Sequence, residues 1–391
     1  MLPAELLPLF ESCRAAGGRA LLVGGCVRDQ LLGLPVKDFD VEVHGVESLA
    51  FLLRGLGPVN EVGRSFGVFK LRLGGHEVDV SAPRRDSKVG PGHQGIRVES
   101  NPHLGTREAA RRRDLTINAI AFDPLTGEWI DPFDGRNDLR QRRLRAVDAS
   151  TFVEDPLRAL RVVQFAARFG FEAEPGLVAL CSGMPLTELP VERVWGEVEK
   201  LLLLGVQPSR GWAFALAAGV WEQVAPEWAT SCPDQLDALA ARAPAEPDRR
   251  LALMLAACCQ PANVESILDR FGLHRWRGSQ LRARVRALVA GRDHATRARE
   301  RRDARRLAAG GILDLFALLA DNGALHELGR ELGILRSPAP PLLDGAVLVQ
   351  LGVAPGPTLG AVLSEARARQ DEGALRSREG ARAWAATWLA R

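Results

Sequence analysis

Two aspartates, Asp38 and Asp40, stand two residues apart in the run DFDVEV, which alternates as a strand does. Side chains on a strand alternate between its faces, so we expect both carboxylates on one face, with Phe39 and Val41 facing a core. Paired carboxylates can hold Mg²⁺, which phosphoryl-transfer enzymes use to bridge a triphosphate and activate an attacking hydroxyl. The alternative interpretation is a solvated strand face.

The residues before this strand form a candidate phosphate-binding site. The run 19–23 is typical of a buried strand, and Gly24 and Gly25 allow a sharp turn close to a ligand before a helix over 27–32. Free N–H groups at the start of that helix attract an anion, and Arg28 can add a charge-assisted bond to phosphate. The two glycines alternatively form a tight turn and nothing more. The P-loop pattern G-x-x-x-x-G-K-[ST] is absent from the sequence.

The run LVGGCVRDQLLGLPVKDFD, residues 22–40, resembles the head-domain signature of class II tRNA nucleotidyltransferases and bacterial poly(A) polymerases. The resemblance implies an α+β polymerase β-like nucleotidyltransferase head with a mixed sheet, followed by an all-α neck, body and tail. We expect the head over 1–146, a neck that selects the base over 147–205, a degenerate RNA-binding body over 206–335 and a tail over 336–391.

Composition is consistent with a soluble, multi-unit protein. The chain has 391 residues, a net charge of +3 and 46% apolar residues, which suffices for two or more cores. Its six cysteines lack the spacing of zinc sites, which predicts reduced thiols. Without a basic leader or a long apolar run, we expect a cytoplasmic protein that does not enter a membrane.

Two strands are expected over 67–73 and 76–81. Asp79 on the second is a candidate third metal carboxylate, because the superfamily often carries one on such a strand; an Asp at a strand edge is the alternative. The stretch 83–106 is rich in Gly and Pro, which predicts a mobile surface loop. In CCA-adding relatives the corresponding loop is tied to the switch from C to A addition, so its presence argues against an enzyme restricted to C.

Arg112, Arg113 and Asp114 resemble the R-R-D motif of the family. The resemblance implies that Arg113 binds triphosphate or ribose and that Asp114 orients it. A solvated helix face is the alternative. The turn at 131–135, DPFDG, resembles the next motif, which helps connect head and neck, or is a simple turn.

Base selection is expected on a helix over 152–169, which opens with acids and a Pro. Asp155 and Arg158 are neighbours on such a helix, and an ion pair is their plainest role. Cytosine and adenine both present an amino donor beside an unprotonated ring nitrogen, whereas uracil and guanine present a carbonyl beside a ring N–H. A carboxylate and an arginine would therefore accept C and A and reject U and G.

This helix also carries the family's E-D-x-x-R motif as Glu154, Asp155 and Arg158, with Arg161 one turn later. The resemblance implies that these residues bind the nucleotide. Relatives often have a further Arg where this chain has Gln164, which can still donate to a base or a phosphate oxygen.

A helix with a core stripe is expected over 191–204. Some bacterial relatives insert a metal-dependent phosphohydrolase domain near 251–261, but Ala and Cys occupy that place here, so we expect no phosphatase activity. The stretch 275–306 has twelve Arg, which form either a solvated face or a groove for tRNA backbone. Residues 342–388 resemble the C-terminal segment of bacterial CCA enzymes.

The sequence therefore predicts a template-independent nucleotidyltransferase that adds or repairs the 3′ CCA end of tRNA from CTP and ATP, with Mg²⁺ at Asp38 and Asp40 and release of pyrophosphate. One alternative is an enzyme that adds A alone, or a poly(A) polymerase. An alternative of another class is an RNA-binding protein without catalytic activity.

Overall fold

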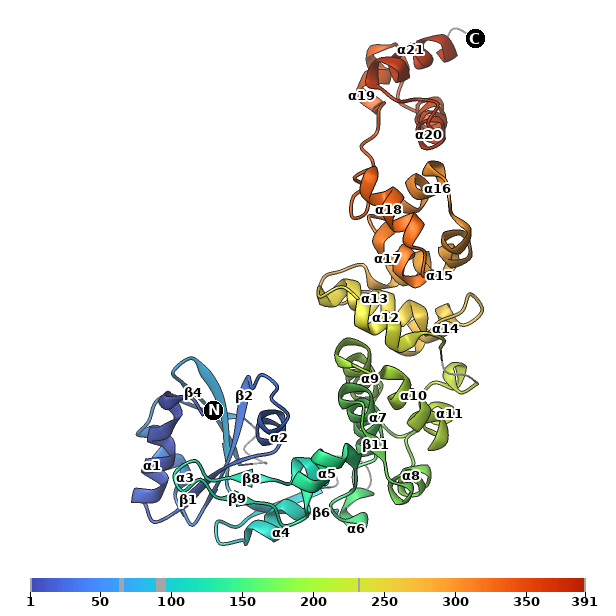
Figure 1. Ribbon diagram of the computed structural model, residues 1–391. Helices are drawn as coiled ribbons and strands as arrows, with labels where there is room; N and C mark the ends of the chain where they lie inside the picture. The colour runs from blue at the N-terminus through green and yellow to red at the C-terminus, as the bar shows by residue number, and fades with distance from the viewer. Residues whose placement is uncertain (1, 63–66, 89–95, 231–232, 390–391) are drawn as a thin grey trace. The chain divides into compact units, whose positions relative to one another are not determined.

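The chain forms two compact units, Met1–Cys232 and Pro233–Arg391 (Figure 1). The computed structural model describes residues 2–62, 67–88, 96–230 and 233–389. The expected division into head, neck, body and tail is finer than these two units, and it stays a prediction.

The head is built on a mixed sheet, as the resemblance implied. Within the described residues it has seven strands in the order β3-β4-β5-β2-β1-β8-β9. β2 and β5 run parallel, and the other neighbours run antiparallel. The strands are β1 (Arg19–Val23), β2 (Asp38–His44), β3 (Val59–Val62), β4 (Val68–Leu73), β5 (His76–Ser81), β8 (Ala121–Phe122) and β9 (Trp129–Ile130).

Short helices accompany this sheet and complete the core of the head. Phe39 and Val41 of β2 are buried, as the alternation predicted, and α1, which packs against β1, buries Leu9 and Phe10. These elements are η1 (Ala4–Leu6), α1 (Leu7–Ala15), α2 (Gly25–Leu31), α3 (Leu49–Arg54), α4 (Thr106–Arg111), η3 (Thr116–Asn118) and α5 (Gly135–Gln141).

The prediction of a surface loop over 83–106 is wrong for most of its described part. β6 (Arg84–Lys88) and β7 (Ile96–Ser100) pair antiparallel over their whole lengths. The Gly-Pro cluster that suggested a loop falls largely in residues 89–95, outside the described residues. These polar strands have a weak strand propensity, but cross-strand hydrogen bonds stabilise them. Local composition does not reveal such pairing.

The neck follows the head within the first unit. The helix expected over 152–169 is present as α7, but it starts five residues later, directly after Pro156, and Phe152 ends the short helix α6. β11 (Glu172–Ala173) pairs with β10 (Arg143–Leu144), an exception to the all-helical expectation. The helices of the first unit after the head are α6 (Ala149–Phe152), α7 (Leu157–Phe169), α8 (Pro175–Ser182), α9 (Val191–Leu204), α10 (Pro208–Ala217), α11 (Val220–Val224) and η4 (Pro226–Trp228), of which the last three lie beyond the expected neck.

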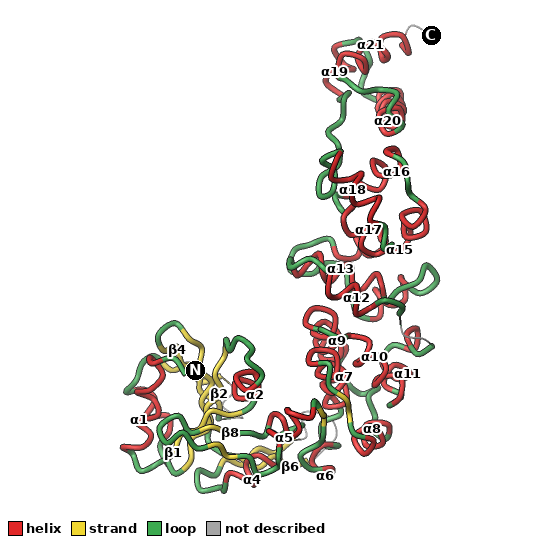
Figure 2. The backbone as a smooth tube through the Cα atoms, in the orientation of Figure 1, coloured by secondary structure: helices red, strands yellow, loops and turns green. Residues whose placement is uncertain are grey.

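The second unit consists of helices joined by loops and has no named strand in its described residues, as Figure 2 shows. Its last three helices bury a cluster of their own that includes Leu348 and Val362. No helix in the described part of the chain is long and apolar enough to cross a membrane. The helices are α12 (Leu236–Arg242), α13 (Pro247–Ala257), α14 (Val264–Arg270), α15 (Leu281–Arg297), α16 (Arg301–Leu307), η5 (Ala308–Gly310), α17 (Leu313–Leu319), α18 (Gly323–Glu331), α19 (Gly345–Gln350), α20 (Pro357–Asp371) and α21 (Arg378–Leu389).

Candidate active site

Three aspartates lie on the neighbouring strands β2 and β5 of the sheet. Asp38 and Asp40 alternate along β2 with buried residues, as expected for one strand face. The parallel pairing of β2 with β5 places Asp79 directly opposite Asp40. Lys70 on β4 forms an ion pair of 3.0 Å with Asp79. Asp79 is thus close enough to be a third carboxylate, but it already has a cation as partner.

The environment of Asp40 suits a bound cation. Burial raises the pKa of Asp40 above its ordinary value; the charge of Arg113 opposes that rise, and the carboxylates of Asp79 and Asp38 add to it. Among the described residues, no group of three or more His, Cys, Asp or Glu forms a ready-made metal cage. A small divalent cation commonly takes one or two carboxylates and completes its shell with substrate phosphates and water. The donor set of Asp38 and Asp40 fits such an ion.

The glycine turn lies against this acidic strand. Gly24 has φ +73° and ψ −135°, a conformation that glycine adopts far more readily than other residues. A Cβ at Gly24 would lie 2.9 Å from Nη1 of Arg113 and 3.4 Å from Oδ2 of Asp40. Gly25 begins α2, and a Cβ there would lie 3.5 Å from Nη2 of Arg28. The turn therefore brings bare backbone between a carboxylate and a guanidinium, where a phosphate could approach.

Arg28 does not lie in the open environment that is expected of an arginine that binds phosphate. Its Nε and Nη2 contact Asp29 at 2.8 and 2.7 Å, and its Nη1 donates to Oδ1 of Asn118 at 2.6 Å. The guanidinium lies over Phe165 and Phe169 of α7, 5.1 and 4.9 Å from the ring centroids. Burial lowers the pKa of this arginine. Arg28 thus packs α2 against the neck, and its contact with phosphate stays a prediction.

Glu42, which sequence reasoning missed, is a buried carboxylate two residues after Asp40. Its Oε2 is 3.3 Å from Nη2 of Arg112 and 3.8 Å from Nη2 of Arg113, and its Oε1 is 3.3 Å from Nε2 of His44. Burial raises the pKa of Glu42, but the hydrogen bond from His44 and the charges of Arg113 and Arg112 outweigh it and lower the value to about 2. The alternation of side chains along a strand could have identified Glu42, because position 42 lies on the same strand face as positions 38 and 40.

The contacts of Asp114 lie with residues other than Arg113, and the expectation that Asp114 orients Arg113 stays a prediction. Oδ2 of Asp114 accepts from Nε of Arg161 at 2.7 Å, and Oδ1 accepts from Nδ2 of Asn118 at 2.9 Å. Burial raises the pKa of Asp114, but the charge of Arg161 and these hydrogen bonds lower it to about 2. Asp114 therefore holds an arginine of the neck, because the fold brings α7 against the segment after α4.

The two residues expected to read the base lie where α7 begins. Arg158 donates from Nη1 to the carbonyl of Thr151 at 2.7 Å and from Nη2 to the carbonyl of Arg112 at 2.6 Å. Oδ2 of Asp155 accepts from Nη2 of Arg193 on α9 at 3.4 Å. An ion pair between Asp155 and Arg158 is not among the contacts of the described residues. Both side chains are thus held by other groups, and each keeps further donors or acceptors for a ligand.

Two remaining candidates lie on or beside α7. Glu154 is half-buried in the turn between α6 and α7. Gln164 is buried, and its Nε2 has no hydrogen-bond partner in the described structure. A buried amide with a spare donor is consistent with the expected contact to a base or phosphate oxygen, which stays a prediction.

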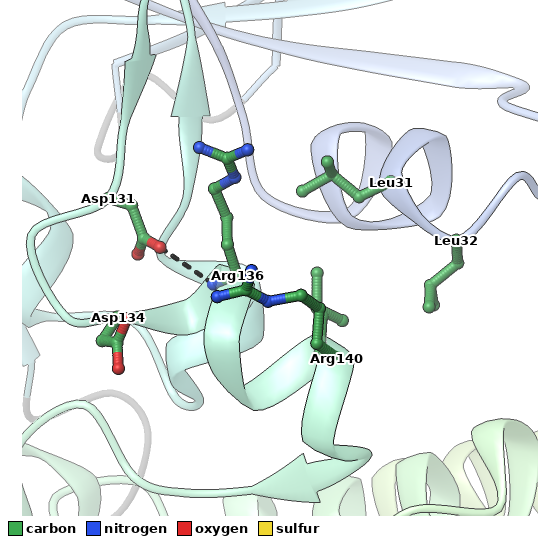
Figure 3. Close-up of a pocket in the computed structure, with 7 residues that line it drawn as sticks. Leu31, Leu32, Asp131, Asp134, Arg136 and Arg140 are labelled. Carbon is green, nitrogen blue, oxygen red and sulfur yellow. Dashed lines mark hydrogen bonds between the residues drawn. The ribbon is translucent and has the colours of Figure 1, made fainter.

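A separate hollow lies at the other end of α2 (Figure 3). Asp131 borders it and accepts from the main-chain N–H of Gly135 at 2.7 Å and of Arg136 at 2.8 Å, which confirms the turn expected at 131–135. None of the candidate catalytic residues lines it. Its volume is about 400 Å³, and its lining is Leu31, Leu32, Asp131, Asp134, Arg136, Leu139 and Arg140.

In the second unit, many arginines of the stretch 275–306 have internal partners. Arg282 contacts Glu265 and Asp269, each at 2.7 Å, and Arg284 contacts Asp248 at 2.5 Å. These ion pairs indicate that part of the stretch is a helix surface whose arginines pair with carboxylates of the same unit. A groove for tRNA backbone stays a prediction.

The segment where relatives carry phosphohydrolase ligands is an apolar core in this chain. Cys258 and Cys259 are buried after α13, and Arg292 donates to the carbonyls of Ala256 and Cys259. A guanidinium at this place repels cations. The absence of phosphatase activity stays a prediction.

The architecture and the acidic strand define a class of protein. Residues 20–145 match the poly A polymerase head domain family. The match covers the head of this chain, and the polymerase β-like nucleotidyltransferases, among which such head domains are counted, typically use divalent metal ions.

Particular relatives are similar over different extents. The Bacillus stearothermophilus CCA-adding enzyme, solved in complex with CTP, is 25% identical with a TM-score of 0.73, over 98% of this chain and 97% of that one. The Thermotoga maritima CCA-adding enzyme, solved with tRNA, shares the fold with 22% identity and a TM-score of 0.71, over 99% of this chain and 96% of that one.

The multifunctional CCA protein of Nitrosococcus oceani is 40% identical over 210 residues, which are 53% of this chain and 50% of that protein. The one of Mannheimia succiniciproducens is 44% identical over 188 residues, 46% and 43% of the two chains. The chain thus spans about half the length of the curated relatives it matches.

Proposed function

We propose that this protein is a tRNA nucleotidyltransferase that adds or repairs the 3′ CCA end from CTP and ATP without a nucleic-acid template and releases pyrophosphate. One observation carries the proposal. The carboxylate strand β2 is linked to Arg158 of the neck through the side chain and the carbonyl of Arg112. Such a link is what an enzyme needs if it is to combine phosphoryl transfer with base selection. The likeness of the whole chain to a CCA-adding enzyme solved with CTP supports the choice of substrate.

Asp38 and Asp40 are the proposed ligands of Mg²⁺. When bound, the ion would activate the 3′-hydroxyl of the RNA and neutralise charge on the triphosphate. Asp79, held by Lys70 at 3.0 Å, is assigned an electrostatic role beside them.

The phosphates of the nucleotide are proposed to lie over the turn of Gly24 and Gly25, with Arg113 as the principal cation. Arg113 flanks the position of a Gly24 Cβ at 2.9 Å, so its guanidinium and the bare backbone face the same space. A guanidinium recognises phosphate oxygens in a fixed geometry. Arg161, held by Asp114, adds positive charge from the neck.

Asp155 and Arg158 are proposed to select the base, with Glu154 and Gln164 beside them. A side chain that reads a hydrogen-bonding edge must be held still, since a mobile one would adapt to the wrong edge. The two carbonyls that accept from Arg158, and Arg193 beside Asp155, provide that restraint. The remaining donors and acceptors can match the edge shared by cytosine and adenine.

The proposed location is the cytoplasm. The described cysteines are buried and form no disulfide bond with one another, as is usual for proteins of a reducing compartment.

The decisive experiment incubates purified protein with Mg²⁺ and either CTP, ATP or both, on three RNAs: tRNA lacking CCA, tRNA lacking the final A, and an unrelated RNA. Lengths are read on a sequencing gel. Addition of CCA and then arrest supports the proposal. Addition of A alone to tRNA ending in CC favours an A-adding enzyme, long A tails favour a poly(A) polymerase, and no addition with retained tRNA binding favours a non-catalytic RNA-binding protein.

A further inference from the structure

Arg113 stands between two carboxylates of the same strand. Its Nη2 is 3.8 Å from Oε2 of Glu42, and its Nη1 flanks the Gly24 turn on the side of Asp40. Asp40 is a proposed metal ligand, whereas Glu42 is buried and not placed to be one. A guanidinium that paired with Asp40 would occupy the oxygens that a divalent cation needs. The position of Arg113 therefore decides whether Asp40 is free to bind metal.

Glu42 is held firmly enough to act as the competing anchor. It is 4% exposed. Besides Arg113, its Oε2 contacts Nη2 of Arg112 at 3.3 Å, and its Oε1 contacts Nε2 of His44 at 3.3 Å. The other ring nitrogen of His44 is 3.0 Å from the carbonyl of Leu104, which fixes the imidazole. A buried carboxylate with both oxygens engaged has a single well-defined position.

Arg112 extends this restraint into the neck. Its side chain contacts Glu42, and its carbonyl accepts from Nη2 of Arg158 at 2.6 Å. A shift of Arg112 would therefore move the support of Arg158. The Glu42 carboxylate thus connects β2, which carries the proposed metal ligands, with Arg113 and, through Arg112, with Arg158.

We infer that Glu42 is a positioning residue of the nucleotidyltransferase site, which holds Arg113 off the metal-binding carboxylates and keeps Arg112 in place beneath Arg158. The inference rests on the proposed function. Without the charge of Glu42, the carboxylate that attracts Arg113 is Asp40, and the metal must then displace a guanidinium to bind.

The test uses Glu42→Gln, which keeps the shape of the side chain and removes its charge. The concentration of Mg²⁺ that gives half-maximal incorporation, and the KM for CTP, should each rise by about tenfold, the effect of losing one charge-assisted contact. The value of kcat at saturating Mg²⁺ and CTP should change far less, and Glu42→Asp should restore part of the Mg²⁺ dependence.

Asp138→Asn is the matched control. Asp138 is also a buried head carboxylate, paired with Arg145 at 2.8 Å and Thr116 at 2.6 Å. In the described structure it contacts none of the candidate site residues. Its substitution therefore shows how the loss of a buried ion pair affects the protein when Arg113 is left unchanged. Its Mg²⁺ requirement and its KM for CTP should match those of the wild type.

Two measurements on the full chain need no turnover. Mn²⁺ binding followed by electron paramagnetic resonance, and CTP binding in Mg²⁺ followed by calorimetry, should both weaken by about tenfold in Glu42→Gln. Equal affinities in wild type and variant, with a lower melting temperature as the sole change, would overturn the inference. If the wild type binds Mn²⁺ and CTP but adds no nucleotide, the proposed function fails, and the two affinities still decide the role of Glu42.

Discussion

Asp114→Asn removes the carboxylate that joins the head to helix α7. Asp114 is 7% exposed and contacts Nε of Arg161 at 2.7 Å. Asparagine has nearly the same shape and can still accept from Nδ2 of Asn118. The substitution therefore removes mainly the charge that Arg161 faces.

The magnitude follows from the pKa of Asp114, which falls from an ordinary 3.8 to about 2. At about 1.4 kcal/mol per pH unit, the ionised carboxylate contributes about 2–3 kcal/mol to stability. Because the folded state has the lower pKa, this contribution is fully present above pH 4 to 5. It is lost as the pH falls from about 4 to about 2, where the carboxylate is protonated in the folded state as well.

Hydrogen exchange of amides in α7 measures this effect locally, which suits a chain of two units that need not unfold together. At pH 6, Asp114→Asn should lower the free energy of opening of α7 by about 2–3 kcal/mol. The difference from the wild type should shrink towards pH 2. Arg161→Gln should cost a similar amount, and the double variant less than the sum. A difference that stays constant from pH 6 to pH 2 would refute the reasoning.

Five further outcomes are expected. Asp40→Asn should abolish addition of both C and A with the fold retained by circular dichroism, whereas Asp79→Asn should retain measurable activity, because Asp79 is already paired with Lys70. Gly24→Ala should lower activity at least tenfold, since its φ of +73° strains any side chain by about 1–3 kcal/mol and the new Cβ meets Arg113. Asp155→Asn should raise misincorporation of UTP in a primer-extension assay, because the amide can donate to the uracil carbonyl. Purified protein with Ni²⁺ or Mg²⁺ should release no phosphate from 2′,3′-cyclic nucleotides, and metal-dependent release would contradict the assignment of the body.

Local patterns predicted the elements that depend on near neighbours. The strand over 76–81 and the helix over 191–204 have the expected bounds, and the alternation around Asp38 and Asp40 was confirmed. Periods of two and 3.6 residues arise from backbone geometry, so a short window contains them. The chemistry of the paired carboxylates was accessible for the same reason.

Expectations that depended on partners distant in the chain fared worse. Arg28 lies against Phe165, and Asp114 against Arg161, although neither pair is close in sequence. The motifs resemble those of the family, but a motif does not say which carboxylate each arginine meets. Glu42 escaped notice because its partners, Arg112 and Arg113, are some seventy residues further along.

The sequence alone determined the chemical groups and their strand and helix settings, since these depend on residue type and local period, and it indicated the class of reaction that we propose. The tertiary structure decided which charge neutralises which, because electrostatic pairing depends on distance and burial after the sheet and the neck have packed. By that criterion, Arg113 shares its charge between Asp40 and Glu42, and Arg158 is held by carbonyls of the chain.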